Sequence, residues 1–388
     1  MATAADLNMM QSDVSCDWSE ADHRFMARAI QIAWNGLYTT EPNPRVGCVL
    51  VKDSAIIAEG FHQKAGEGHA EVNALRAAGE KAQGCTAYVT LEPCSHFGKT
   101  PPCADALIDA GVAEVIIGMV DPNPQVSGNG IARLEQSGIK VRSGLLEAQA
   151  RELNPGFIKR MESGLPYVRI KMATSLDGRT AMASGESQWI TGPQARQDVQ
   201  RLRARSSAII SGIGSIIQDD SALTLRAEQL GLENAEEIVK RQPLRVVLDS
   251  SGRMPENAKM LNLPGQTLIF SCAEAPAFIA RHETVEWLQI KAGQGGIDLQ
   301  KVLHTLTQRG CNEVLVETGA TLAGAFVEAG LVDQLVIYQA MKLLGSSARP
   351  MFLLPLDTMN QQVELKLTDS RVLGQDIRLT LERAEDSQ

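Results

Sequence analysis

Short apolar, β-branched runs alternate with helix-like segments along most of this chain, and the alternation pauses only around residues 150–166. Strands that alternate with helices favour an α/β fold with a mainly parallel sheet covered by helices. No unit recurs at a fixed period, which sets aside solenoids and propellers. The sequence therefore predicts two α/β domains in succession.

Local signals place the individual elements. Ser19 with Asp22 three residues later indicates a helix start, and apolar residues follow at helical spacing up to Leu37. Further elements of the first half are expected as strands at 46–51, 55–60, 86–94 and 113–121, helices at 69–78 and 103–111, and a helix and strand within 131–141. Those of the second half include strands at 168–178, 207–214, 244–250, 267–272, 312–320 and 333–341, and helices at 193–206 and 321–331.

The segment 154–166, NPGFIKRMESGLP, carries two prolines and two glycines and is the expected domain boundary. Residues 1–17 are small and polar without periodicity, which indicates a disordered tail. The predicted domains are 18–160 and 166–382. A length of 388 residues agrees with two or three domains of about 150 residues each.

Composition limits the partners and the compartment. Lys and Arg number 37 against 46 Asp and Glu, and the formal charge of −9 argues against a nucleic-acid or anionic-membrane binder. The chain has no apolar run of about 18 residues and no Lys or Arg before Arg24, so neither a membrane span nor a secretory signal is expected. Seven thinly spread cysteines indicate a reducing compartment, which we expect to be the cytoplasm.

One group of residues has the composition of a catalytic zinc site. His69 begins a predicted helix, and Cys94 and Cys103 are separated by eight residues. One imidazole and two thiolates suit Zn²⁺ and leave its fourth position open for a water that is activated for attack. Glu71 follows His69 by two residues, where a carboxylate can carry protons without binding the metal. This pattern is the signature of zinc nucleobase deaminases.

The alternative is a structural zinc site whose fourth ligand would be His62, His96 or Cys85. That interpretation leaves Glu71 without a role. Deaminases of nucleic acids and free nucleosides usually place two residues between the cysteines, whereas this chain has eight.

Several blocks of the chain resemble one family. TTEPNPRVGCVLVKD, EGFHQKAGEGHAEVNALRAAGEKAQGCTAYVTLEPCSHFGKTPPCADALIDAGV and DPNPQVSGNGI are similar to the deaminase half of the bacterial bifunctional riboflavin-biosynthesis deaminase/reductases. KMATSLDGRTAMASGESQWITGPQAR, DSALTLR and VETGATLAGA are similar to the reductase half. The resemblance covers about residues 18–382. It implies a cytidine-deaminase-like three-layer α/β/α domain followed by a dihydrofolate-reductase-like α/β domain.

The resemblance also implies two reactions. The first is the zinc-dependent hydrolytic deamination of 2,5-diamino-6-(5-phosphoribosylamino)pyrimidin-4(3H)-one, with Glu71 as general base and then acid. The second is the NADPH-dependent reduction of the ribosyl group of 5-amino-6-(5-phosphoribosylamino)uracil to ribityl. One Zn²⁺ per chain, NADPH and a homo-oligomer, either a dimer or a tetramer, are implied as well.

Residues that match family positions in the mouth of the first site are Asn43, His62, His96 and Lys99. The resemblance implies that they orient the pyrimidine and neutralise its phosphate, for which Lys99 is a suitable point charge. Each has a plain structural alternative: Asn43 lies between two prolines and favours a turn, and His62 can be a core residue.

The second half lacks the glycine fingerprint of a Rossmann dinucleotide site. Small residues follow two predicted strands at 212–215 and 319–325, where backbone N–H groups can approach a pyrophosphate or simply permit close helix packing. The resemblance favours the interpretation that these segments bind the cofactor. The positions that it implies for NADPH binding are Ala173, Trp189, Ser215, Asp219, Ser250, Gly319, Ala320, Thr321, Leu322, Ala323, Gly324 and Ala325.

Substrate positions implied for the reductase are Ser187, Arg203, Leu223 and Arg226, together with Glu317. The alternative interpretation of Arg203 is that it belongs to a solvated helix face, since it lies in the basic run RLRARS. Lys171 and Glu317 are expected to act as a catalytic pair that assists ring opening and proton delivery. The family usually has a proline where this chain has Ser221, which we expect to alter affinity rather than abolish activity.

Overall fold

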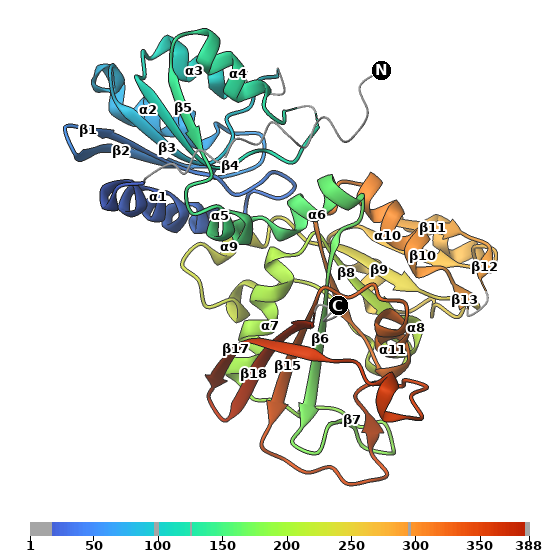
Figure 1. The fold of residues 1–388 in the computed structure, drawn as a ribbon. Coiled ribbons are helices and arrows are strands. Elements are labelled where there is room, and N and C mark those ends of the chain that lie inside the picture. Colours follow the sequence, from blue (N-terminus) through green and yellow to red (C-terminus); the bar gives the residue numbers. More distant parts are fainter. Residues whose placement is uncertain (1–17, 97–100, 125, 294–295, 385–388) are drawn as a thin grey trace, which may run out of the picture. The chain divides into compact units, whose positions relative to one another are not determined.

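The computed structural model of the protein describes residues 18–96, 101–124, 126–293 and 296–384 (Figure 1). The expected tail at 1–17 and the candidate Lys99 lie outside these residues. The described chain divides into two compact units. The first holds the residues up to Asn35 and Arg45–Leu153, and the second holds Gly36–Pro44 and the residues from Asn154 onward. Among the described residues, no helix is long and apolar enough to span a membrane.

The first unit is a five-stranded sheet between helices, with the strand order β2-β1-β3-β4-β5 (Figure 1). Its strands are β1 (Gly47–Lys52), β2 (Ala55–Phe61), β3 (Thr86–Leu91), β4 (Glu114–Met119) and β5 (Lys140–Ser143). Its helices are α1 (Glu20–Ala33), α2 (Ala70–Ala78), α3 (Cys103–Asp109), α4 (Asn129–Gln136) and α5 (Glu147–Leu153). The α1 and α5 layer lies on one side of the sheet, and α3 and α4 lie on the other.

The predicted start of α1 is confirmed. The Asp22 N–H donates to Ser19 Oγ at 3.1 Å and the Ser19 N–H donates to Asp22 Oδ2 at 3.0 Å, which closes a capping box. Phe25 and Ala29 lie on the buried face of the helix and pack against the sheet. The helix ends earlier than its apolar spacing suggested, at Ala33 rather than at Leu37.

The expectation of a mainly parallel sheet holds only in part for the first unit. β1 pairs antiparallel with both β2 and β3, whereas β3 pairs parallel with β4 and β4 with β5, so β1 alone runs against the other four strands. Asp53 and Ser54, which join β1 to β2, both have positive φ values, of 50° and 61°. A two-residue turn of this kind joins a tight hairpin, so β2 must run antiparallel to β1.

The second unit is built on a nine-stranded sheet in the order β11-β10-β9-β8-β14-β6-β15-β18-β17. The strands of this sheet are β6 (Tyr167–Ser175), β8 (Ala208–Gly212), β9 (Leu244–Leu248), β10 (Thr267–Ser271), β11 (Val285–Gln289), β14 (Glu313–Glu317), β15 (Gln334–Ala340), β17 (Leu365–Leu373) and β18 (Asp376–Arg383). Short strands form two further pairs, β7 (Arg179–Ala181) with β16 (Arg349–Pro350) and β12 (Ala292–Gly293) with β13 (Gly296–Ile297). The helices are α6 (Pro155–Ser163), α7 (Pro193–Arg205), α8 (Ile213–Asp219), α9 (Ala235–Ile238), α10 (Leu299–Gln308) and α11 (Ala320–Glu328).

Seven neighbouring strands of this sheet, from β11 to β15, run parallel, and only the β17–β18 hairpin is antiparallel. Two apolar cores cover the two faces. Apolar residues of α7 and α8 form one core with the sheet, and those of α10 and α11 form the other. The carboxyl ends of the parallel strands therefore meet at one edge, where ligands of open α/β sheets bind.

Two segments differ from the sequence expectation. The stretch with paired prolines and glycines contains a helix, α6, with Pro155 in its first turn and Gly164 in the left-handed conformation at its end. Proline near the start and glycine just past the end are favourable helix boundaries, so these residues delimit a helix, which directly follows the division of the two units between Leu153 and Asn154. The β17–β18 hairpin was not expected, and most of the residues of β17 are exposed on both faces.

Candidate active sites

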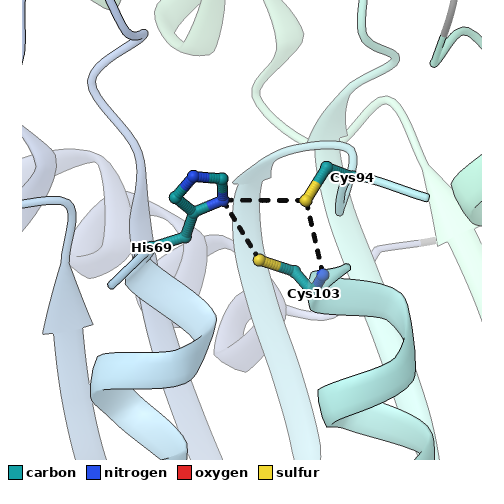
Figure 2. Close-up of side chains that lie close together, drawn as sticks. All are labelled: His69, Cys94 and Cys103. Atoms are coloured by element: carbon teal, nitrogen blue, oxygen red, sulfur yellow. Dashed lines mark hydrogen bonds between the residues drawn. The ribbon is translucent and has the colours of Figure 1, made fainter. Parts of the chain in front are cut away.

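The metal-ligand candidates come together in the first unit (Figure 2). His69 is the N-cap of α2, Cys94 follows β3, and Cys103 is the first residue of α3. His69 Nδ1 lies 3.2 Å from Cys103 Sγ and 3.6 Å from Cys94 Sγ, and the Cys103 N–H donates to Cys94 Sγ at 3.3 Å. Two helix starts and one loop therefore present an imidazole and two thiols to one point.

This donor set fits a zinc ion. The three ligand atoms lie within 4.8 Å of one another, and within the described part of the chain no fourth His, Cys, Asp or Glu joins the group. His62, His96 and Cys85 are therefore not members, so the geometry does not favour a closed four-ligand site. Three protein ligands with an open position are typical of catalytic zinc.

Glu71 lies beside this group without belonging to it. The side chain belongs to the first turn of α2 and is 3% exposed. Burial and, to a smaller extent, the charge of the neighbouring Cys94 raise the pKa of Glu71 to about 7, while His69 opposes the shift. A carboxyl group that both gains and loses a proton near neutral pH is suited to general acid and base work.

The two thiols differ in their readiness to ionise. The hydrogen bond with Cys103 lowers the pKa of Cys94 to about 4, although burial opposes the change. The same hydrogen bond raises the pKa of Cys103, because its thiol is the group that keeps its proton. The lowered pKa of Cys94 favours its thiolate, the form that binds metals.

The other candidates of the first site are placed differently from one another. His62 is buried, its ring stands at 81° to that of His69 with 5.2 Å between centroids, and its Nδ1 lies 3.1 Å from the Gly68 carbonyl oxygen. His96 is exposed. Asn43 belongs to the segment 36–44, which is part of the second unit, and its N–H donates to Thr40 O at 2.8 Å.

In the second unit, Lys171 and Glu317 are directly opposite each other on the neighbouring strands β6 and β14. Lys171 Nζ lies 3.9 Å from Glu317 Oε2. Arg203, from α7, donates to both carboxylate oxygens of Glu317, at 2.5 and 2.9 Å, and to Thr224 O at 3.2 Å. The structure therefore forms a largely buried cluster of two cations and one carboxylate, whose side chains are 9% to 18% exposed.

The charged groups of this cluster shift one another's pKa values. Burial raises the pKa of Glu317, but the charges of Arg203 and Lys171 and the hydrogen bond from Arg203 leave it below its ordinary value. Burial lowers the pKa of Lys171, although Glu317 opposes this. The side chain of Arg203 is only 15% exposed, which does not match the alternative of a solvated helix face.

Candidate cofactor positions line the carboxyl edge of the sheet. Ala173 lies in β6, and Ser215, Ser250 and Gly319 follow β8, β9 and β14 respectively. These four strands are neighbours in the order β9-β8-β14-β6. A Cβ on Gly212 would lie 3.4 Å from Thr318, so the segments that follow β8 and β14 adjoin each other. Gly319 is the N-cap of α11, whose first turn presents free N–H groups at this edge.

Not every residue of the 319–325 segment is open to a ligand. Gly319 and Thr321 are exposed, and Ala320, Leu322 and Ala325 are half-buried. Ala323 is fully buried, and a Cβ on Gly324 would lie 2.0 Å from Leu353 O. Close packing of α11 on the Leu353 backbone explains the small residue at position 324.

The remaining reductase candidates range from exposed to buried. Trp189 is 64% exposed, and the guanidinium of Arg196 lies 4.7 Å from its ring centroid. Arg226 and Asp219 are exposed, and Ser187 is half-buried. Leu223 is 4% exposed and belongs to the core that α7 covers.

Sequence reasoning missed Lys342. Its Nζ donates to the carbonyl oxygens of Trp189 and Ile190, at 2.9 and 2.7 Å. Asp177 fixes the neighbouring segment, because its carboxylate accepts the N–H groups of Leu344 and Gly345. No local signal could have found Lys342, because more than 150 residues separate it from the backbone that it holds.

Comparisons with known proteins match both halves of the chain. A family model of the cytidine and deoxycytidylate deaminase zinc-binding region matches residues 19–119, and the RibD C-terminal domain matches residues 166–379. The riboflavin biosynthesis protein RibD of Escherichia coli is 51% identical over 93% of this chain and 99% of its own length. RibD of Bacillus amyloliquefaciens is 41% identical over 92% of this chain and 95% of its own.

Solved structures extend the likeness to the fold. RibD of Acinetobacter baumannii has a TM-score of 0.88 at 50% identity, covering 94% of this chain and 99% of its own. A deaminase/reductase of Thermotoga maritima has a TM-score of 0.80 at 32% identity, with the same coverage. The prediction of a cytidine-deaminase-like domain followed by a reductase domain is confirmed. The chain belongs to the RibD family, the bifunctional deaminase/reductases of riboflavin biosynthesis.

Proposed function

We propose that the first unit deaminates 2,5-diamino-6-(5-phosphoribosylamino)pyrimidin-4(3H)-one and that the second reduces the product, 5-amino-6-(5-phosphoribosylamino)uracil, with NADPH. The Thermotoga maritima relative is a diaminohydroxyphosphoribosylaminopyrimidine deaminase and 5-amino-6-(5-phosphoribosylamino)uracil reductase, which supports this pair of substrates. The observation that carries the proposal is the grouping of His69, Cys94 and Cys103 beside the buried Glu71.

His69, Cys94 and Cys103 would hold the metal of the deaminase, which we propose to be one Zn²⁺ per chain. Zinc in such a site supplies a Lewis acid and lowers the pKa of a bound water to about 7. Glu71 accepts a proton from the attacking water and transfers it to the ring nitrogen. It then accepts the proton of the new hydroxyl group, which becomes the carbonyl, and delivers it to the amino group, which leaves as ammonia. Its burial beside the ligands favours this exchange, because the neutral and charged forms lie close in free energy near pH 7.

The reductase half requires that the ribosylamine ring open before it is reduced. NADPH would supply the hydride, which adds to the former anomeric carbon and leaves a ribityl chain. Lys171 is the proposed proton donor for ring opening, because burial lowers its pKa and makes the proton easier to release. Glu317 holds Lys171 and Arg203 in place through the ion pairs described above.

The substrate phosphate and the cofactor would be bound by residues around these clusters. For the first site we retain His62, His96, Lys99 and Asn43 as substrate candidates. For the second we retain Ser187, Arg226 and the carboxyl-edge positions Ala173, Ser215, Ser250 and Gly319. We further propose a cytoplasmic homo-oligomer that acts on small molecules, with domains at 18–160 and 166–382.

The order of the two reactions provides the test. NADPH should be oxidised when 5-amino-6-(5-phosphoribosylamino)uracil is added to the Glu71→Gln variant, and not when the diamino compound is added. The variant is needed because the wild-type protein would convert the second compound into the first. Equal NADPH oxidation with both compounds would overturn the proposed order.

A further inference from the structure

Glu92 is a buried carboxylate that the chemistry above does not use. It is 3% exposed and lies between the end of β3 and the candidate ligand Cys94. Its Oε2 accepts the N–H groups of Asp121 and Gly128, at 3.2 and 3.0 Å. Its Oε1 accepts those of Gly130 and Ile131, at 2.9 and 3.2 Å. One side chain therefore satisfies four backbone donors from a segment about 30 to 40 residues away.

Two of these donors belong to the first turn of α4. The N-cap of this helix is Gly128, which has φ +78° and no side chain with which to cap it. The first N–H groups of a helix lack partners within the helix, and a side-chain acceptor usually supplies one from the N-cap itself. Here Glu92 caps α4 from another part of the fold, and its negative charge suits the positive end of the helix dipole.

The same contact brings α4 against the metal-ligand loop. A Cβ on Gly130 would lie 2.0 Å from Pro93 O, so α4 begins in direct contact with the residue before Cys94. α4 is joined in turn to α3 by an ion pair between Arg133 and Asp105. Since α3 begins at Cys103, both candidate thiolates are tied to the start of α4.

We propose that Glu92 is a positioning residue of the deaminase: by capping α4 it holds Cys94 and Cys103 at the separation that the metal requires. This inference rests on the proposed metal site. Glu92 acts through the backbone N–H groups of Asp121, Gly128, Gly130 and Ile131. Residues that orient metal ligands from outside typically change metal affinity or activity by about 10- to 100-fold when they are mutated.

Glu92→Gln in the full-length protein tests the proposal. The amide keeps the size of the side chain but replaces one acceptor with an NH₂ group that faces two N–H donors. The matched control is Glu135→Gln, on the exposed face of the same helix. Both variants are loaded with Co²⁺, whose visible spectrum reports thiolate geometry, and their metal dissociation constants and deaminase kinetics are measured.

We expect Glu92→Gln to bind Co²⁺ and Zn²⁺ about 10- to 100-fold more weakly, with an altered cobalt spectrum and a kcat for ammonia release lowered more than KM is raised. Its reductase rate on directly supplied aminouracil phosphate should stay at the wild-type level. If Glu92→Gln is insoluble, Glu92→Asp, which keeps the charge but is one methylene shorter, carries the same test.

Metal affinity, spectrum and kcat equal to those of Glu135→Gln would overturn the role of Glu92, and so would an equal loss of both activities. Failure of the proposed function is a separate result: the wild-type protein itself would then bind no stoichiometric Co²⁺ or release no ammonia.

Discussion

The two candidate sites are assembled in opposite ways. The first takes its metal-ligand candidates from residues 69–103, at two helix starts and one loop, and needs only three side chains. The second pairs Lys171 with Glu317 across neighbouring strands and adds Arg203 from a helix that covers the sheet. The first depends on residue types at short spacing, whereas the second depends on strand order and register.

This difference has a functional consequence. No residue is a candidate for both sites, and the candidates of each site lie within one compact unit, except that Asn43, a candidate of the first site, belongs to the second unit. A change in one cluster should therefore abolish one reaction and leave the other measurable in the same chain. The reaction of the unchanged site then serves as the internal control for folding.

The largest effect is expected for Cys103→Ser. A neutral hydroxyl is a poor zinc ligand compared with a thiolate, so the variant should lose its metal and all measurable ammonia release. Elemental analysis and a deaminase assay check this, with the reductase rate retained. Cys272→Ser, outside the ligand group, is the control. Full zinc occupancy in Cys103→Ser would remove Cys103 from the ligand set.

A loss of about 10²- to 10⁴-fold in deaminase kcat is expected for Glu71→Gln, because the amide cannot carry a proton between water and ammonia. Zinc content should not change, which separates this variant from the ligand mutants. The control is Glu80→Gln, an exposed position that follows the same helix. Deamination at the wild-type rate would exclude the proton-transfer role.

On the reductase side, Glu317→Gln should lower kcat by about 100-fold and the free energy of unfolding by about 3 kcal/mol, because it leaves Lys171 and Arg203 buried without their anion. Ammonia release should be unaffected. The reductase rate is measured in stopped assays and the free energy of unfolding in urea. The control is Glu328→Gln, an exposed position on α11. An unchanged reductase rate would contradict the role given to the cluster.

Acid should affect the same cluster. The pKa of Glu317 is lower in the folded protein than its ordinary value, so its contribution to stability is present above the unfolded pKa of about 4.3 and is lost as the pH falls through the folded value. Unfolding measured from pH 6 down to pH 2 should therefore show a smaller acid loss in Glu317→Gln than in wild type. Identical pH profiles would mean that the ion pairs do not stabilise the fold.

The smallest effect is expected for Trp189→Ala. An exposed aromatic beside a nicotinamide contributes about 0.5–1.5 kcal/mol, so KM for NADPH should rise by about 2- to 10-fold. Stability should not change, because the side chain is 64% exposed. Steady-state kinetics measure this KM, and Leu343→Ala, another exposed position, is the control. An unchanged KM for NADPH in Trp189→Ala would contradict a place for Trp189 at the cofactor.

The metal-ligand group could be predicted from the sequence for a physical reason. His69, Cys94 and Cys103 are residue types that few other roles require together, and their spacing matches helix starts that local signals reveal. Lys171 and Glu317 were found through family resemblance, since nothing local shows that β6 and β14 are neighbours. The bidentate contact of Arg203 with Glu317 needs the three-dimensional packing of α7.

Prediction of the fold from the sequence was limited in the same way, to elements with a clear local pattern. Buried strands such as β8 and β14 were found because their apolar runs are continuous. β17 was missed because most of its residues are exposed and leave no period-two pattern. The helix between Pro155 and Gly164 was not predicted, because its prolines and glycines were interpreted only as a domain boundary. Proline and glycine mark helix ends as well as loops, and only the residues between them distinguish the two.

The central claim is that one chain carries two sequential reactions at two separate sites. The most direct test is to supply the diaminopyrimidinone ribosyl phosphate to the zinc-loaded protein, with and without NADPH, and to identify the products by mass. Without NADPH we predict ammonia and the ribosylamino-uracil phosphate, and with NADPH the ribitylamino compound. A reduced product that retains both amino groups, or no ammonia in either case, would contradict the account.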